Sequence, residues 1–422
     1  MNVTEMNERF EPPLVVVVVG RPGSTDWCKT NESGTVEWTF FDELFRCFSY
    51  DIGSSRAANP AIPVYFSIGE FAPDDASSPP PLIDIARTRR TLVFVLLDSG
   101  FRKATDRWTR FFADMRRRAQ DSSNELLFIP MARVDDGQLR RDILRLGLGT
   151  VAPVCAYLGD ERCQQLNDAA RFFRVSAMIA AIQALRSKPD GKQPIDVFIS
   201  YARRDGESVA HRLRDAVAGY PGIGAIIDSM AFSPGASVDA DLLEEKLAAS
   251  TCVVVFQTNS YADRVWCRRE ALLAKKCDAP IIVVELLGGL ERRGWLGLAN
   301  CPRFRMSGEI DCDFKEIVEI AVSETLRIAH HRSRSAAMLA LAGIDPHRVE
   351  VLPRTPDLLR LVGLVASNAQ AVRLDRRPKD LILHPDPPLP EDELSVLRMV
   401  DPNFQFLTPS TIIIDTVTTE MV

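Results

Sequence analysis

Two stretches of sequence decide the fold class: Ile195-Asp-Val-Phe-Ile-Ser200 and Cys252-Val-Val-Val-Phe-Gln257. Both are short, almost continuously apolar and rich in β-branched or aromatic residues, which is typical of strands buried on both faces of a parallel sheet. The same patterns predict further strands at 225–228 and 280–287, and helices at 207–218, 238–249 and 263–277. This alternation predicts a doubly wound, flavodoxin-like α/β domain.

Outward from this core, the chain separates into three blocks. A polar stretch with two prolines and a glycine, 186–194, is typical of a linker, and a charged junction at 330–335 follows a helical pattern at 314–329. We therefore predict an α/β domain at 12–186, the central domain at 194–330, and a small C-terminal α/β appendage of unknown function at 336–422.

The two flanking blocks have their own predicted elements. In the first block, strands are expected at 14–19, 61–66, 92–97 and 126–130, and helices at 40–50, 106–119 and 161–185. In the last block, strands are expected at 379–383 and 411–414 and a helix at 391–400. Both blocks are thus predicted to be α/β.

Composition excludes several classes of protein. The 422 residues are 46% apolar and 26% charged, which is typical of a globular protein and rules out collagen, coiled coil and general disorder. A net charge of −6 argues against a nucleic-acid partner. The nine cysteines form no Cys-x-x-Cys pair and the five histidines show no metal spacing, so neither a disulfide scaffold nor a metal site is expected. The apolar run at 14–19 is too short for a signal peptide or membrane span, and a cytoplasmic location is expected.

Four stretches of the central block carry a family resemblance. In chain order they are Asp196-Val-Phe-Ile-Ser-Tyr201, Asp228-Ser-Met-Ala-Phe-Ser-Pro-Gly235, Ala249-Ser-Thr-Cys-Val-Val-Val-Phe256 with Ser260-Tyr261, and Trp266-Cys-Arg-Arg-Glu270 with Pro280-Ile-Ile-Val-Val284. In this order and spacing they resemble the Toll/interleukin-1 receptor (TIR) domain family, of the bacterial NAD-cleaving type. The resemblance covers about a third of the chain.

Glu270 is the residue that bears on catalysis. TIR domains that cleave NAD carry a glutamate four residues after this tryptophan, and residues i and i+4 share one face of a helix, so Trp266 and Glu270 are expected to meet. The resemblance implies that Glu270 stabilises an oxocarbenium-like ribose while nicotinamide leaves. The competing interpretation is a solvated helix glutamate beside Arg268 and Arg269.

Four other residues are placed at or near the site by the resemblance or by their loops. Tyr201 and Arg203 follow the first strand and are expected to contact the nucleotide, although they are also consistent with a simple helix-starting turn. Phe232 can cover the pocket, dock on a neighbouring subunit or fold back on its own domain. Arg264 replaces a small hydroxyl residue of the family, and can either bind phosphate or obstruct the ribose.

The first block contains a candidate internal repeat of this pattern. Residues 84–95 correspond to 245–255, and Trp108 corresponds to Trp266, but the residue four positions on is Phe112. This interpretation makes the first block a divergent, non-catalytic TIR-like domain. In the alternative interpretation the alignment is fortuitous and Phe112 is a core residue.

The resulting hypothesis is a cytoplasmic TIR-type NAD+ nucleosidase or cyclase that uses NAD+ as its substrate and needs no cofactor. By resemblance it is activated by self-association through TIR domains, serves bacterial immunity against phage, and senses a phage-derived or small-molecule trigger through its flanking domains. Two competitors stay open: a non-enzymatic TIR adaptor, and a nucleotide-binding scaffold centred on the first block. The Gly20-Arg-Pro-Gly23 turn lacks the Gly-Lys-Ser/Thr of a phosphate loop, which argues against the scaffold.

Overall fold

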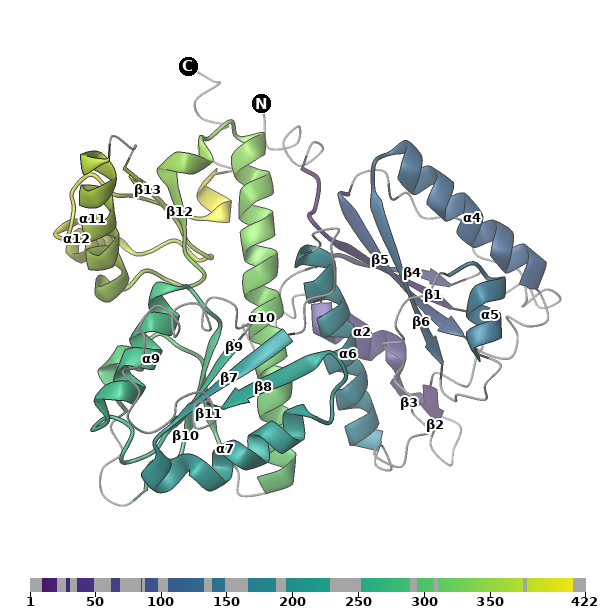
Figure 1. Ribbon diagram of the computed structural model, residues 1–422. Helices are drawn as coiled ribbons and strands as arrows, with labels where there is room; N and C mark the ends of the chain where they lie inside the picture. Colours follow the sequence, from purple (N-terminus) through teal and green to yellow (C-terminus); the bar gives the residue numbers. More distant parts are fainter. Residues whose placement is uncertain are drawn as a thin grey trace. The chain divides into compact units, whose positions relative to one another are not determined.

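The chain folds into two compact units, which are described separately (Figure 1). One spans Glu11–Gln193; the other spans Pro194–Val422 and includes Phe10. The computed structural model describes residues 10–20, 28–30, 36–48, 62–68, 85, 88–97, 105–132, 139–148, 166–186, 195–227, 252–288, 294–306, 310–374 and 378–412.

The second unit contains a five-stranded, wholly parallel sheet in the order β11-β10-β9-β7-β8. Its strands are β7 (Ile195–Tyr201), β8 (Ile223–Ile227), β9 (Cys252–Gln257), β10 (Ile281–Glu285) and β11 (Arg303–Arg305). The central strands β7, β9 and β10 are almost entirely buried, because helices cover both faces of the sheet. This confirms the predicted doubly wound α/β fold.

Among the described residues of this domain, three helices cover the sheet. α9 (Val265–Lys276) packs on the face formed by Phe198, Val253 and Val255. α7 (Arg203–Val217) and α10 (Ile310–Leu341) contact each other and lie on the opposite face. The predicted helix at 238–249 lies outside the described residues.

α10 is longer than predicted and corrects the interpretation of 330–335. Rather than ending at residue 329, the helix continues through the charged stretch to Leu341. Three of its polar side chains, His330, His331 and Ser335, are buried, and a ring nitrogen of His331 lies 3.1 Å from the backbone oxygen of Leu352. The charged stretch is therefore about a turn and a half of packed helix within α10, and not a junction that follows the helix.

A second, smaller parallel sheet follows α10 within the same unit. Its order is β12 (Val349–Val351), β13 (Leu381–Leu383), β14 (Gln405–Leu407), with α11 (Leu358–Arg373) and α12 (Glu391–Arg398) as the crossover helices. The C-terminal part of α10 packs on this sheet through Met338 and Leu339.

The strand predicted at 411–414 is wrong, because 409–412 is helical and the strand precedes it at β14. Pro409 stands at the first helical position, and the side chain of Thr408 accepts a hydrogen bond from Thr411 N. A capping residue followed by proline therefore overrides the β-branched run at this point. The last predicted residues of that strand lie outside the described residues.

The first unit contains a four-stranded parallel sheet in the order β4-β1-β5-β6. Its strands are β1 (Val15–Gly20), β4 (Val64–Ile68), β5 (Arg90–Leu97) and β6 (Glu125–Ala132), and its helices are α2 (Phe40–Phe48), α4 (Thr105–Asp121), α5 (Leu139–Arg145) and α6 (Leu166–Arg186). An unpredicted antiparallel pair, β2 (Cys28–Thr30) and β3 (Val36–Thr39), precedes α2.

The two larger sheets have the same strand order. β4-β1-β5-β6 and β8-β7-β9-β10 each place the first strand of the sequence between the second and the third, with the fourth outside the third. α4 connects β5 to β6 in the same way that α9 connects β9 to β10. Trp108 of α4 and Trp266 of α9 therefore occupy corresponding helices of the two sheets.

No helix among the described residues combines the length and the apolar character needed to cross a lipid bilayer.

Candidate functional site

Glu270 is placed on the buried face of α9. The buried residues of this helix are Cys267, Glu270, Ala271 and Ala274, at the spacing of an amphipathic helix that packs on a sheet. Glu270 is only 1% exposed, although its neighbours on this face are small or apolar. Isolated carboxylates are costly to bury, so this position requires polar partners.

Two hydroxyl groups organise the carboxylate. The hydroxyl of Ser200, at the end of β7, donates a hydrogen bond of 2.5 Å to Glu270 Oε2 and lies 2.8 Å from the hydroxyl of Tyr261. Tyr261 in turn donates to the backbone carbonyl of Cys267, on α9 itself, at 3.0 Å. This set of contacts ties β7, the β9–α9 loop and α9 together around one carboxylate.

The pKa of the Tyr261 phenol is raised well above its usual value. Burial is the main cause, and the charge of Glu270 adds to it, while the hydrogen bond with Ser200 opposes it. Tyr261 is therefore a neutral hydrogen-bond donor at physiological pH. A neutral phenol donates its one hydrogen to the Cys267 carbonyl and places no second negative charge beside Glu270.

Alternation along β7 separates two residues that are adjacent in the sequence. Ser200 faces α9 and Glu270, whereas the Tyr201 side chain lies on the other face of the sheet. There it packs closely against α7, because a Cβ added to Gly206 would stand 3.2 Å from Tyr201 Cβ. The Tyr201 backbone oxygen accepts a weak bond from Cys267 Sγ at 3.5 Å. The structure therefore brings Ser200 to Glu270 and directs the Tyr201 ring elsewhere.

The other predicted site residues are placed as follows. Trp266 is half-buried beside the apolar cluster of α9, and the Arg269 guanidinium lies 5.6 Å from its ring centroid. Arg203 is exposed in the first turn of α7, and Arg264 is exposed immediately before α9. Phe232 lies outside the described residues. Arg203 and Trp266 are thus at the same edge of the sheet as the end of β7, on different helices.

A second carboxylate ties two loops together at this edge. Asp205 accepts hydrogen bonds from the Thr258 hydroxyl at 2.6 Å and from Ser260 N at 3.0 Å, so the start of α7 is joined to the β9–α9 loop. Partial burial would raise the pKa of Asp205, but the hydrogen bonds from Thr258 and Ser260 outweigh it and lower that pKa. Asp205 therefore stays ionised and holds the rim of the site in place.

Ser200, Tyr261 and Asp205 were not identified as site residues from the sequence. In the sequence, Ser200 belongs to the first of the four TIR-like stretches and Tyr261 to the third. The signal for Ser200 was present, because every second residue of β7 faces α9 and a serine at such a position needs a polar partner. The long-range pairing of Ser200 with Glu270, 70 residues apart, was not readable from the chain.

The corresponding place in the first unit is apolar. Phe112 of α4 is fully buried, with its ring centroid 5.9 Å from that of Trp108 and 5.4 Å from that of Phe128. Trp108 is itself fully buried, unlike Trp266. This helix therefore presents an aromatic cluster to its sheet where α9 presents a carboxylate.

The described part of the chain contains no cluster of three or more His, Cys, Asp or Glu side chains that could hold a metal ion. What the geometry around Glu270 offers is a single oriented carboxylate at the carboxyl edge of a doubly wound parallel sheet. Such an edge is where α/β domains bind their ligands.

Comparison with known families identifies this domain. Residues 197–316 match the family model of the TIR domain, so this part of the chain is a TIR domain. The matched segment includes Ser200, Tyr261, Trp266 and Glu270 and ends inside α10. The predicted TIR domain and α/β fold class are thereby confirmed for the central block.

Comparisons with whole proteins add little. No curated protein sequence matches the chain. Among solved structures, similarity is found to a fungal multi-domain GH3 β-N-acetylglucosaminidase with a glucosamine N-acetyltransferase region, at 8% identity and a TM-score of 0.23, covering 56% of this chain and 34% of that one. Tagatose-6-phosphate ketose/aldose isomerase from Escherichia coli matches at 12% identity and a TM-score of 0.20, covering 78% and 85%. The chain thus spans about a third of the first of these proteins, and TM-scores this low carry no argument about fold or function.

Proposed function

We propose that the TIR domain of this chain cleaves NAD+ and releases nicotinamide, with Glu270 as the catalytic carboxylate. The observation that supports the proposal is the placement of Glu270. Its carboxylate is held by Ser200 at the end of a central strand, inside the segment that matches the TIR family. A helix glutamate with no role in the site would be expected to face solvent, whereas Glu270 is 1% exposed.

Cleavage of NAD+ to release nicotinamide requires chiefly one well-placed negative charge from the protein. Nicotinamide leaves NAD+ as a neutral molecule, so no general acid is required for its departure. Positive charge develops on the ribose, and a carboxylate aimed at the ribose stabilises it. The hydrogen bond from Ser200 fixes the direction of the carboxylate before substrate arrives. Water then completes hydrolysis to ADP-ribose, or an atom of the ADP-ribose itself completes cyclisation.

The nucleotide would be held at the same edge of the sheet. Arg203 is exposed in the first turn of α7, where a guanidinium can meet the pyrophosphate, and Trp266 supplies an aromatic surface one helical turn before Glu270. Tyr201 supports this loop through its packing against α7. The predicted role of Phe232 stays a prediction.

Self-association is the proposed activating step. In a single chain the Glu270 carboxylate has almost no access to solvent, so the isolated protein is expected to be nearly inactive. Contacts between TIR domains of neighbouring chains would open and complete the site. We further propose, from the family resemblance, a cytoplasmic role in bacterial antiphage immunity, in which the flanking domains receive a phage-derived or small-molecule trigger.

The test follows nicotinamide release from NAD+ by liquid chromatography, with purified full-length protein at high concentration and a crowding agent. We expect release by the wild type, and a loss of about 10²–10³-fold in Glu270→Gln. Glu207→Gln, which removes an exposed carboxylate from α7, is the matched control and should retain activity.

The adaptor alternative makes the opposite prediction. An adaptor that acts only through TIR–TIR contacts would release no nicotinamide in any assembled form. Unchanged nicotinamide release by Glu270→Gln would still support NAD+ cleavage, but it would show that Glu270 is not the catalytic carboxylate.

A further inference from the structure

The solvent-facing side of α11 is apolar along the whole helix. Among the residues that α11 exposes, only Arg373 is charged. The large apolar ones, each at least half exposed, are Leu358, Leu359, Val362 and Val372. The others are small or neutral: Gly363, Ala366, Ser367, Ala369 and Gln370. Residues three and four positions apart are neighbours on a helix, so these side chains form one continuous surface, which we call the α11 strip.

α7 shows that a helix on a parallel sheet does not need such a surface. α7 has 15 residues and α11 has 16, and each buries one side against a sheet. The residues that α7 exposes are all charged except Ser208: Arg203, Arg204, Asp205, Glu207, Ser208, Arg212 and Asp215. A helix that is apolar on its outer side as well is usually covered on that side too.

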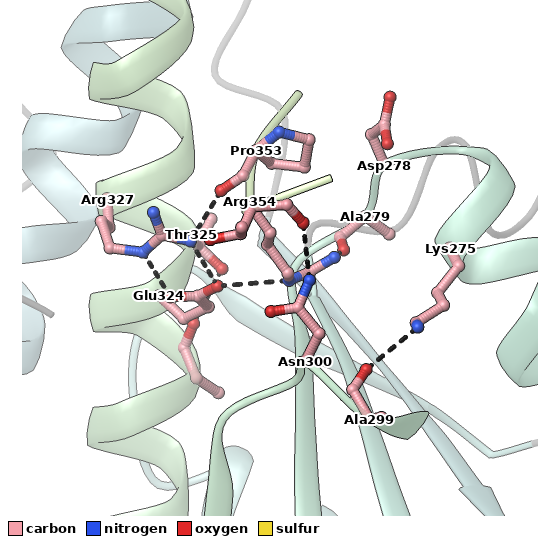
Figure 2. A network of polar contacts seen from close by, with 12 residues as sticks. Lys275, Asp278, Ala279, Ala299, Asn300, Glu324, Thr325, Arg327, Pro353 and Arg354 are labelled. Atoms are coloured by element: carbon pink, nitrogen blue, oxygen red, sulfur yellow. Dashed lines mark hydrogen bonds and ion pairs between the residues drawn. The ribbon is translucent and has the colours of Figure 1, made fainter. Parts of the chain in front are cut away.

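The α11 strip stands on a fixed base. The inner side of α11 packs on the small sheet in a single hydrophobic cluster. The loop before α11 is tied to the rest of the unit, because Arg327 of α10 donates a hydrogen bond to the Pro353 carbonyl at 3.0 Å (Figure 2). Arg354 of the same loop donates to the Ala279 carbonyl at 2.7 Å. The strip is therefore a constant feature of the surface.

The α11 strip can pair with itself about Ala366. Leu359 and Arg373 each lie seven residues from Ala366, and Val362 and Gln370 each lie four, so these residues follow one line along the helix. The alanine allows two helices to approach closely at that point. In an antiparallel pair with Ala366 opposite Ala366, Leu359 meets the aliphatic part of Arg373 from the second copy. A two-fold contact of this kind uses the same patch on both chains.

Charge favours the antiparallel arrangement over the parallel one. Parallel helices would bring the two Arg373 side chains together, and like charges placed opposite each other weaken an interface. In the antiparallel pair the two Arg373 positions are separated by fourteen residues of helix rise, or about 21 Å. This is more than the Debye length of about 8 Å at physiological ionic strength, so the repulsion is largely screened.

The size of the α11 strip determines how strong the contact can be. A helix of 16 residues is about 24 Å long and about 10 Å wide, which gives a footprint of roughly 240 Å² on each chain. Leu272 of α9, which is 42% exposed, lines one surface depression together with Leu359 and Gly363 and widens this area. Stable dimers bury about 800 Å² on each partner. The area therefore fits a weak dimer that forms as the protein concentration rises.

We propose that the α11 strip is the contact surface of a reversible homodimer of this chain, with the two α11 helices antiparallel about a two-fold axis at Ala366. This contact lies outside the segment 197–316 that matches the TIR domain. It is thus distinct from contacts between TIR domains, and it does not rest on NAD+ cleavage.

The first test is sedimentation of the full-length protein without NAD+, at micromolar to submillimolar concentration. We expect the mean mass of the wild type to rise with concentration from that of one chain toward that of two. Ala366→Arg places two like charges face to face and should weaken dimerisation by about tenfold or more. Ala336→Arg, the same substitution at an exposed alanine of α10, is the matched control and should dimerise as the wild type does. Circular dichroism of both variants would establish that they fold.

The second test is a cross-link that reports the geometry. A residue on the two-fold axis meets its own copy, so Ala366→Cys should give a covalent dimer on a non-reducing gel after mild oxidation. The wild type and Ala336→Cys give the background from the native cysteines. No cross-link above this background would overturn the antiparallel arrangement.

Two results of the sedimentation test would overturn the dimer surface itself. Unchanged dimerisation of Ala366→Arg would place the contact elsewhere, for instance between TIR domains. A wild type that stays monomeric at submillimolar concentration would show that a second copy does not cover the α11 strip.

Discussion

The sheets of the first unit and of the TIR domain share one strand order, but the helix after the third strand differs in what it buries. α9 turns Glu270 toward its sheet, where Ser200 holds it and Tyr261 contacts Ser200. α4 turns Phe112 toward its sheet among other aromatic rings. One fold can thus hold either a polar site or an apolar core at the same place. A divergent repeat would have this shared order, and so would any two domains of this fold; at this position the first unit has no carboxylate.

The difference extends to the tryptophans. Trp108 is completely buried, and Trp266 is half-buried with Arg269 over its ring. The first is part of a core, and the second is available to a ligand. If the comparison is correct, substitutions in α4 should change stability, and substitutions in α9 should change activity.

The largest effect is expected from placing a carboxylate in the first unit, as Phe112→Glu. No hydroxyl pair like Ser200 and Tyr261 is expected to receive it among the aromatic rings, so the loss of the ring alone costs about 3–5 kcal/mol and the buried charge adds to this. Urea unfolding followed by circular dichroism would measure it. A loss of less than 1 kcal/mol in the free energy of unfolding would contradict the difference between position 112 of α4 and position 270 of α9.

The tryptophans provide a second contrast of similar kind. Trp108→Ala should cost about 3–5 kcal/mol of unfolding free energy, because a fully buried ring leaves a cavity. Trp266→Ala should cost about 1–2 kcal/mol, since part of its surface is already in water. Comparable losses in the two variants, measured by the same urea unfolding, would contradict the comparison.

The stability of the second unit should depend on pH through the buried His331. Burial, together with the nearby charge of Arg327, lowers the pKa of His331 to about 4, whereas the hydrogen bond to Leu352 opposes that shift. The unfolded chain, with a pKa near 6.5, binds the proton more readily, so stability is lost as pH falls from about 6.5 to about 4, by about 3 kcal/mol in total.

The variant His331→Gln should lose this part of the acid sensitivity. Unfolding free energies at pH 7 and pH 4.5 would be compared for the two proteins. An identical pH dependence in wild type and His331→Gln would mean that His331 is not kept neutral by burial.

The smallest effect concerns the positioning of Glu270. Ser200→Ala removes the hydroxyl that orients the carboxylate and should lower kcat about tenfold with little change in KM, as expected for loss of one hydrogen bond to a charged group. Tyr201→Phe is the control, because the Tyr201 ring lies on the other face of the sheet. A larger loss of kcat in Tyr201→Phe than in Ser200→Ala would contradict the assigned geometry.

The fold was largely predictable from the sequence, and the site only in part. Continuous apolar strands such as β7 and β9 have a period and a length that identify them without tertiary information. The stretch at 330–335 was misinterpreted because its charged composition conceals that His331 and Ser335 are buried. Glu270 could be identified through its spacing from Trp266, whereas its partners Ser200 and Tyr261 are brought to it only by the register of β7 beside β9.

The most direct test of the account is to compare assembly and nicotinamide release in one preparation of Glu270→Gln. Sedimentation would measure assembly, and chromatography would measure release from NAD+. The account predicts assembly equal to that of the wild type together with a loss of release of about 10²–10³-fold. Release within a few-fold of the wild type, from protein that assembles normally, would contradict the claim that Glu270 is the catalytic residue.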